Sequence, residues 1–146
     1  MRIVWIMTFL APMLFGYGVG DKVPPSVQKS MAFPDGKIII VDFFASWCHA
    51  CEKELVLLEK MPLDASNVIM IGVDIDKDVS KGKAFQKKLS LSFHVINDNQ
   101  QTLVKAFNPI AMPALYIIKD NQIQMIITGA RDNIDHVIQK ALQHLP

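Results

Sequence analysis

The chain has 146 residues, 51% of them hydrophobic and 20% charged, which suits one domain with a single core and argues against a second folded domain. Its 15 basic and 14 acidic residues nearly cancel, and no cluster of lysine or arginine stands out, so nucleic acid is excluded as an expected partner. The 2 cysteines, Cys48 and Cys51, exclude a scaffold held by several disulfides, so we expect them to serve reactivity within a domain spanning residues 21–146.

Residues 1–20 resemble an export signal. Arg2 precedes an apolar run from Ile3 to Phe15, and glycines follow at alternating positions, where a signal peptidase could cut. Without cleavage, the run is close to the shortest helix that spans a membrane and would serve as an N-terminal membrane anchor. Both outcomes place the domain in the periplasm or another extracytoplasmic compartment, with membrane contact only through this segment. A buried helix or strand of the fold itself is the remaining alternative.

The domain begins with a lead-in followed by a strand and a helix. Residues 21–35 are rich in proline and predict an irregular segment that could hold a short edge strand. Residues 37–45 carry the β-branched and aromatic run of a strand covered on both faces. Apolar and charged residues then alternate at helical spacing over 48–61, and Pro62 ends that amphipathic helix.

A second strand and helix follow in the middle of the chain. Residues 68–75 repeat the pattern of a buried strand, and residues 79–89 predict a lysine-rich surface helix. A polar turn at 97–99 leads to a short helix over 101–107.

The last third predicts a hairpin and a final helix. Strands over 114–118 and 123–128 are joined by the turn Asp120-Asn121. Asp132 is expected to cap a helix that runs to about His144. This order of elements predicts an α/β fold in which helices flank a mixed central sheet.

The two cysteines lie at the junction of the first strand and the first long helix. Cys48 falls at the helix N-terminus, where unpaired amide groups and the helix dipole stabilise a thiolate and make it a nucleophile. Cys51 lies one turn inside, close enough to resolve a mixed disulfide by bonding to Cys48. The spacing therefore predicts a two-electron dithiol-disulfide exchange.

Metal binding is an alternative use of the cysteine pair. Zinc normally takes four ligands, and neither a second cysteine pair nor a grouped set of histidines accompanies Cys48 and Cys51. Haem attachment would need a histidine directly after Cys51, where Glu52 stands. We therefore expect no metal and no cofactor, although two soft thiolates leave open a copper-binding chaperone module of the same fold.

Two neighbours of the cysteines have alternative interpretations. His49 could add positive charge beside the Cys48 thiolate and make the couple more oxidising, or it could be exposed and without influence. Trp47 could form an aromatic shelf on which a polypeptide substrate docks, or it could serve packing alone.

Residues 41–51, VDFFASWCHAC, resemble the active-site strand and helix start of thioredoxins. Glu54, the strand at 71–74, the segment at 93–98 and the run Met112-Pro113-Ala114 resemble the TlpA/ResA/DsbE branch of extracytoplasmic thioredoxin-like proteins. The segment from Trp47 to Glu54 is also similar to the C-terminal domain of DsbD. The resemblance spans roughly residues 19–146 and implies a thioredoxin fold.

The resemblance also implies roles for single residues. Met112-Pro113 would be the cis peptide that faces the cysteines, with the backbone of Met112 pairing with an extended substrate. Asp42 would be the buried acid that exchanges a proton with Cys51, in contrast to a solvated acid at the strand end. Glu54 either tunes the site or lies on the exposed helix face, and we favour the exposed position.

Several departures from the TlpA branch accompany this resemblance, among them Asp42, where asparagine is common in that branch. No proline lies between the cysteines, Val56 stands where a proline is usual, and Ala111 and Ala114 occupy places often held by glycine and threonine.

The expected function is a protein-disulfide reductase that takes electrons from a membrane or periplasmic donor, for example in cytochrome c maturation.

Overall fold

The computed structural model describes residues 15–146. Most of the predicted signal or anchor segment, residues 1–14, lies outside the described residues. Within residues 15–146, no helix has both the length and the apolar character needed to cross a membrane. The segment that leads into the domain lies against it, because Tyr17 N–H donates to the Phe107 carbonyl at 3.2 Å and Gly20 N–H donates to the Ile123 carbonyl at 2.8 Å.

A mixed sheet of 5 strands forms the centre of the domain, in the order β3-β2-β1-β4-β5. The strands are β1 (Ile38–Phe44), β2 (Val68–Asp74), β3 (His94–Asn97), β4 (Ala114–Lys119) and β5 (Gln122–Thr128). The central strand β1 is parallel to β2 and antiparallel to β4, and all of its residues are buried. Full burial explains why its sequence is a continuous apolar run with one acid.

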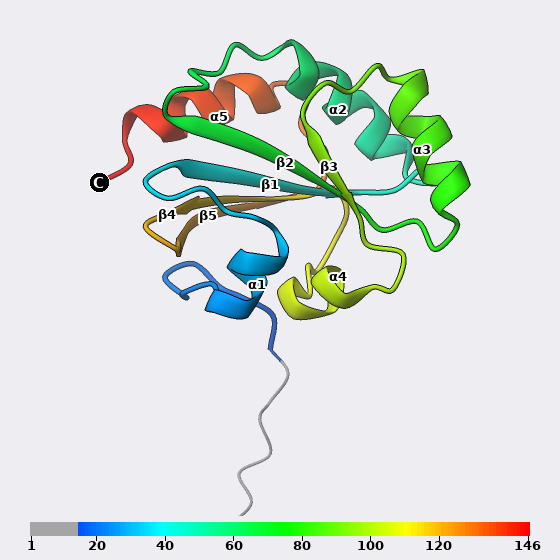
Figure 1. Cartoon of the computed structure of the whole chain (residues 1–146). Coiled ribbons are helices and arrows are strands. Elements are labelled where there is room, and N and C mark those ends of the chain that lie inside the picture. Colours follow the sequence, from blue (N-terminus) through cyan, green and yellow to red (C-terminus); the bar gives the residue numbers. More distant parts are fainter. Residues whose placement is uncertain (1–14) are drawn as a thin grey trace, which may run out of the picture.

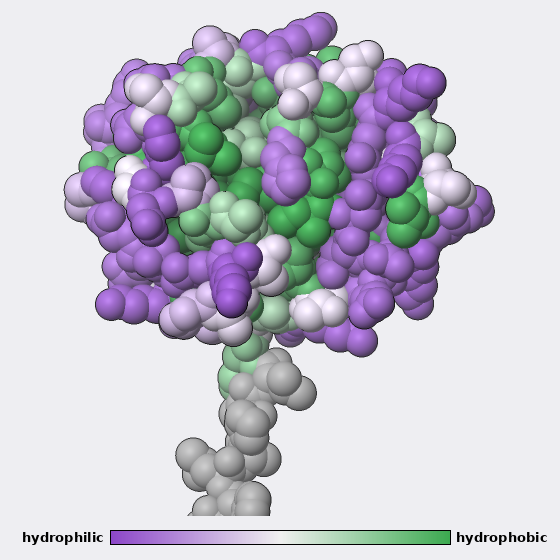
Figure 2. Space-filling model, viewed as in Figure 1, coloured by the Kyte–Doolittle hydropathy of each residue, from purple (hydrophilic) through white to green (hydrophobic). Residues whose placement is uncertain are grey.

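Helices cover both faces of this sheet, as predicted for an α/β fold. They are α1 (Pro25–Ser30), α2 (His49–Lys60), α3 (Val79–Lys88), α4 (Thr102–Phe107) and α5 (Ile134–Gln143). Figure 1 shows α2, α3 and α5 on one side of the sheet and α1 and α4 on the other. On the face seen in Figure 2, hydrophobic residues gather at the centre, over β2 and β3, and hydrophilic residues cover α3.

The two faces of β1 pack against different helices. Phe43 faces α4, with its ring centroid 5.0 Å from that of Phe107. Ile40 points to the opposite face, where it belongs to the same buried cluster as Leu58 of α2 and Ile138 of α5. Because side chains alternate along a strand, Asp42 lies on the same face as Ile40, beneath α2.

Two elements differ from the sequence-based predictions. The lead-in contains the helix α1 instead of an edge strand, and its only β-type contact within the described residues is an isolated bridge between Lys22 and Gln122. Pro25 suits the first turn of a helix because its missing N–H has no partner to lose there. Strand β3 was not predicted, since its four residues show no strand period and its pairing with β2 stabilises it.

The predicted cap of the last helix was also wrong. Asn133, not Asp132, is the N-cap residue of α5, and no side chain caps the helix. The helix begins at Ile134, which is fully buried, so core packing sets its start.

Candidate functional site

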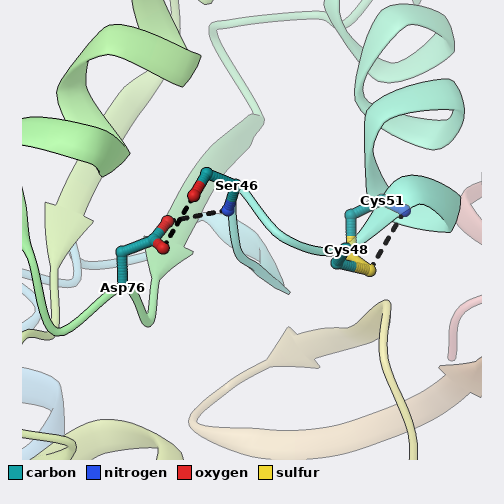
Figure 3. The surroundings of a disulfide bond; sticks show 4 residues. All are labelled: Ser46, Cys48, Cys51 and Asp76. Atoms are coloured by element: carbon teal, nitrogen blue, oxygen red, sulfur yellow. Dashed lines mark hydrogen bonds between the residues drawn. A yellow bond between two sulfur atoms is a disulfide. The ribbon is translucent and has the colours of Figure 1, made fainter.

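The cysteine pair lies where β1 leads into α2. The chain turns between Ala45 and Cys48, where the Cys48 N–H donates to the Ala45 carbonyl at 3.1 Å. Cys48 is the N-cap residue of α2, and its sulfur accepts a hydrogen bond from the Cys51 N–H at 3.2 Å. The two cysteines form a disulfide with Cα atoms 5.2 Å apart (Figure 3). The sequence therefore placed both sulfurs correctly at the start of the helix.

The two cysteines differ in exposure. Cys48 retains 8% of its surface, whereas Cys51 is completely buried. An attacking sulfur must be accessible and a resolving sulfur need not be, so the geometry suits Cys48 as nucleophile and Cys51 as its partner. An N-cap position also offers backbone N–H groups and the positive end of the α2 dipole to a thiolate at Cys48.

Asp42 lies under α2 and is completely buried. Neither of its carboxyl oxygens has a hydrogen-bond partner among the described residues. Burial raises the pKa of Asp42 well above its usual value, and the charge of Glu54 raises it further. A carboxylate in this environment is a stronger base than an exposed one, so it is better suited to take a proton from a thiol.

Glu54 does not lie on the exposed helix face, which corrects our prediction. It is only 2% exposed, and its Oε2 atom lacks a hydrogen-bond partner among residues 15–146. Glu54 follows Cys51 by three residues, so both lie on the side of α2 that faces the sheet. Burial raises the pKa of Glu54 to about 7, although the backbone and the positive charge of Arg131 act in the opposite direction.

The residues expected to contact substrate are Trp47, Met112 and Pro113. Trp47 is 67% exposed, so packing does not account for it. The Met112-Pro113 peptide bond is cis, as the resemblance implied. Pro113 is buried and its carbonyl accepts the Gly129 N–H at 2.9 Å, while Met112 is half-buried at the edge of the core. Ile110 in the same loop, which was not predicted from the sequence, is apolar and 91% exposed.

His49 is exposed at the first position of α2. It lines an open groove of about 590 Å³ along this helix, together with Glu52, Lys53, Val56, Leu57 and Asp132. His49 therefore lies beside the cysteines without being buried among them.

A second contact at the site involves Ser46 and Asp76, which sequence analysis did not single out. Asp76 follows β2, and its carboxylate accepts hydrogen bonds from the backbone and the hydroxyl of Ser46 (Figure 3). A signal was present in the sequence. Neighbouring parallel strands end at the same edge of a sheet, so an acid after β2 lies beside the turn that follows β1.

No three side chains of the His, Cys, Asp or Glu type lie together as a metal site would require within residues 15–146. The two sulfurs are bonded to each other. The copper-binding alternative therefore finds no support in the described part of the chain.

The chain resembles known proteins in sequence and in fold. Residues 25–126 match the AhpC/TSA family. The thiol-disulfide oxidoreductase ResA of Geobacillus kaustophilus is 25% identical over 103 residues, covering 68% of this chain and 59% of the relative. The chain thus spans about three fifths of the length of this curated relative.

Two solved structures share the fold. A putative thiol:disulfide interchange protein DsbE from Chlorobium tepidum superimposes with a TM-score of 0.75 at 18% identity, covering 88% of this chain and 97% of the other. A secreted disulfide oxidoreductase from Mycobacterium tuberculosis superimposes with a TM-score of 0.66 at 21% identity, covering 80% of this chain and 86% of the other. The thioredoxin fold expected from the resemblance is therefore confirmed.

Proposed function

The chain belongs to the AhpC/TSA family, and we propose that it is a thiol-disulfide oxidoreductase that reduces disulfides of protein substrates through Cys48 and Cys51. One observation carries the proposal: the slightly exposed sulfur at the N-cap of α2 is bonded to a fully buried sulfur one turn further on. The name of the ResA relative supports it.

The proposed reaction has two steps. In the first, the Cys48 thiolate attacks one sulfur of a substrate disulfide, a mixed disulfide forms, and the other substrate sulfur leaves as a thiolate. In the second, Asp42 accepts the proton of Cys51, and the Cys51 sulfur attacks the Cys48 sulfur. The internal disulfide forms, the second substrate sulfur leaves, and two electrons have passed to the substrate.

The neighbouring residues have distinct parts in this proposal. Trp47 and Met112 contact the substrate polypeptide next to the reacting sulfurs, with Pro113 shaping the loop that carries Met112. His49 and Glu54 tune the couple from opposite sides, His49 from the solvent and Glu54 from beneath the helix. The exposure of Trp47 and the burial of Glu54 support these assignments.

The proposed setting is extracytoplasmic. Residues 1–20 would direct export or anchor the domain, and a donor in the membrane or periplasm would return the cysteines to the reduced state. The secreted solved relative supports this location. Reduction of an apocytochrome disulfide during cytochrome c maturation is the substrate class that we propose first.

Trapping of the mixed disulfide tests the proposed function. The full chain, reduced and incubated with a disulfide-containing apocytochrome peptide, should reduce it. Cys51→Ser should accumulate the mixed disulfide, because no second sulfur resolves it, and Cys48→Ser should form none. Equal trapping by both variants, or an inactive wild type, would refute the assignment.

The direction of exchange has its own test. We expect equilibration with glutathione to give a potential nearer to the value of about −270 mV found for thioredoxin than to about −120 mV, typical of strong periplasmic oxidants. A potential near about −120 mV would show that the protein acts as an oxidase.

A further inference from the structure

The turn that carries Trp47 and Cys48 is held from the side by Asp76. The Ser46 N–H donates to Asp76 Oδ2 at 2.7 Å, and the Ser46 hydroxyl donates to Asp76 Oδ1 at 2.8 Å. Both oxygens of a carboxylate that is only 5% exposed are thus used by one residue of the turn (Figure 3). Hydrogen bonds to a buried charged group are among the stronger ones in proteins.

Asp76 is itself fixed by its neighbours. Its N–H donates to Asp74 Oδ1 at 2.9 Å, and Gln86 Nε2 of α3 donates to Asp74 Oδ2 at 2.6 Å and to Asn97 Oδ1 at 2.9 Å. Gly82 permits this approach, because a Cβ atom there would collide with the Asp74 carboxylate. A chain of hydrogen bonds therefore runs from α3 and β3 to the turn before Cys48.

The turn has few other contacts to hold it. Ser46 and Trp47 are its two central residues, the backbone closes it through the bond from Cys48 to Ala45, and the Trp47 side chain is mostly in solvent. The Cys48 sulfur gains the N-terminal amides of α2 only in the N-cap position. Whatever fixes Ser46 therefore also fixes the environment of the sulfur two residues later.

We propose that Asp76 is a positioning residue for disulfide exchange, which acts through Ser46 to keep Cys48 at the N-cap of α2 and Trp47 beside the substrate. The inference rests on the proposed function and deepens it. Asp76 does not touch the reacting atoms, so its effect should appear in the reactivity of Cys48.

The pH profile of Cys48 alkylation by iodoacetamide, measured on the reduced full chain, tests this role. In Asp76→Ala the midpoint should rise towards the value of about 8.5 for free cysteine, because the sulfur is no longer held over the amides. The kcat/KM for insulin reduction should fall on the order of 10- to 100-fold, the cost of a small misplacement of reacting groups. Asp76→Asn should restore both, since an amide can still accept from the Ser46 N–H and donate to its hydroxyl oxygen.

Asp78→Ala is the matched control. Asp78 lies two residues further along the same loop and caps α3 through the Ser80 and Lys81 N–H groups, and it accepts no hydrogen bond from Ser46. Its loss should lower the melting temperature and leave the alkylation profile unchanged. If Asp76→Ala does the same, with unchanged kcat/KM, Asp76 has only a structural role and the inference is overturned.

Ser46→Ala keeps the test decisive if Asp76→Ala does not fold. It removes one of the two hydrogen bonds and should lower kcat/KM roughly threefold, with a smaller shift of the profile in the same direction. An unchanged profile would overturn the inference. A wild-type Cys48 that already titrates like free cysteine would overturn the proposed function first, and the inference with it.

Discussion

Two groups of buried acids flank the ends of the central strands, and they differ in hydrogen bonding. Neither oxygen of Asp42 has a hydrogen-bond partner among the described residues, and Oε2 of Glu54 has none there either. Asp74, Asp76 and Asp98 lie at or after the ends of β2 and β3, and the oxygens of each accept hydrogen bonds from nearby backbone or side chains. Burial alone therefore does not define what an acid does in this fold.

The difference separates acids suited to proton transfer from acids that fix the structure. Burial raises the pKa of Asp74 to about 6, although hydrogen bonds from the Asp76 N–H and the Gln86 amide act in the opposite direction. Asp42 has no such donors, and its pKa is raised well above the usual value. We infer that Asp42, which lacks donors, serves proton transfer and that the hydrogen-bonded acids fix loops, and substitutions test this difference.

Replacement of Asp42 should slow disulfide exchange more than replacement of any of the other buried acids. Replacing it by asparagine removes the group that accepts the Cys51 proton, so resolution of the mixed disulfide should slow roughly 100- to 1,000-fold. Quenched-flow measurement of the mixed disulfide with a labelled substrate peptide would follow that step directly. The first step, attack by Cys48, should keep its rate and serves as the internal control. Resolution at the wild-type rate would show that Asp42 does not accept the Cys51 proton.

Glu54 should make the folded protein less stable as the pH rises. Its pKa is about 7 in the folded chain against an ordinary value of 4.5, so between these values the folded chain holds a proton that the unfolded chain has released. The contribution is complete below pH 4.5 and is lost as the pH rises through 7, which amounts to roughly 3 kcal/mol of unfolding free energy. Urea unfolding at pH 4.5 and pH 8 measures this loss.

Glu54→Gln should remove the part of the pH dependence of the unfolding free energy that Glu54 contributes. The part due to Asp42, which has the same sign, should remain. Glu52→Gln is the control on the same helix, because Glu52 is paired with Lys88 at the surface and its pKa is lowered, mainly by that hydrogen bond. If the unfolding free energy of Glu54→Gln changes with pH as it does in the wild type, Glu54 does not release its proton on unfolding.

The cysteine site could be predicted because its signals are local. The apolar run of β1, the helix spacing of α2 and the position of Cys48 between them lie within one stretch of sequence, and the structure places them as expected. The cis peptide before Pro113 came from the resemblance, since a proline before a strand does not by itself indicate its isomer.

The acids could not be sorted from the sequence, because their roles depend on contacts between distant segments. Glu54 has charged neighbours in sequence and resembles a surface residue, yet its position relative to Cys51 turns it towards the sheet. Asp76 gains its role only when β2 lies beside β1 and brings it to Ser46. Strand β3 is equally a product of pairing, since its sequence lacks a strand period.

Replacement of Asp98 should have the weakest effect of these substitutions. It should lower the stability of the fold, as expected for an acid that fixes the structure. It is buried, and its two oxygens accept the Leu103 and Val104 N–H groups at 3.1 and 2.8 Å. It thereby caps α4, whose own N-cap residue, Gln101, provides no side-chain cap. Asp98→Ala should lower the free energy of unfolding by about 1–2 kcal/mol, because two N–H groups lose their acceptors.

Chemical denaturation at fixed pH measures the Asp98 effect, and Thr102→Ala, at the exposed first position of α4, is its control. The rate at which the mixed disulfide resolves should be unchanged in Asp98→Ala, because this acid stabilises a helix and moves no proton. If resolution is slower in Asp98→Ala, Asp98 takes part in proton transfer as Asp42 does. Hydrogen bonding would then not distinguish acids that fix the structure from acids that transfer protons.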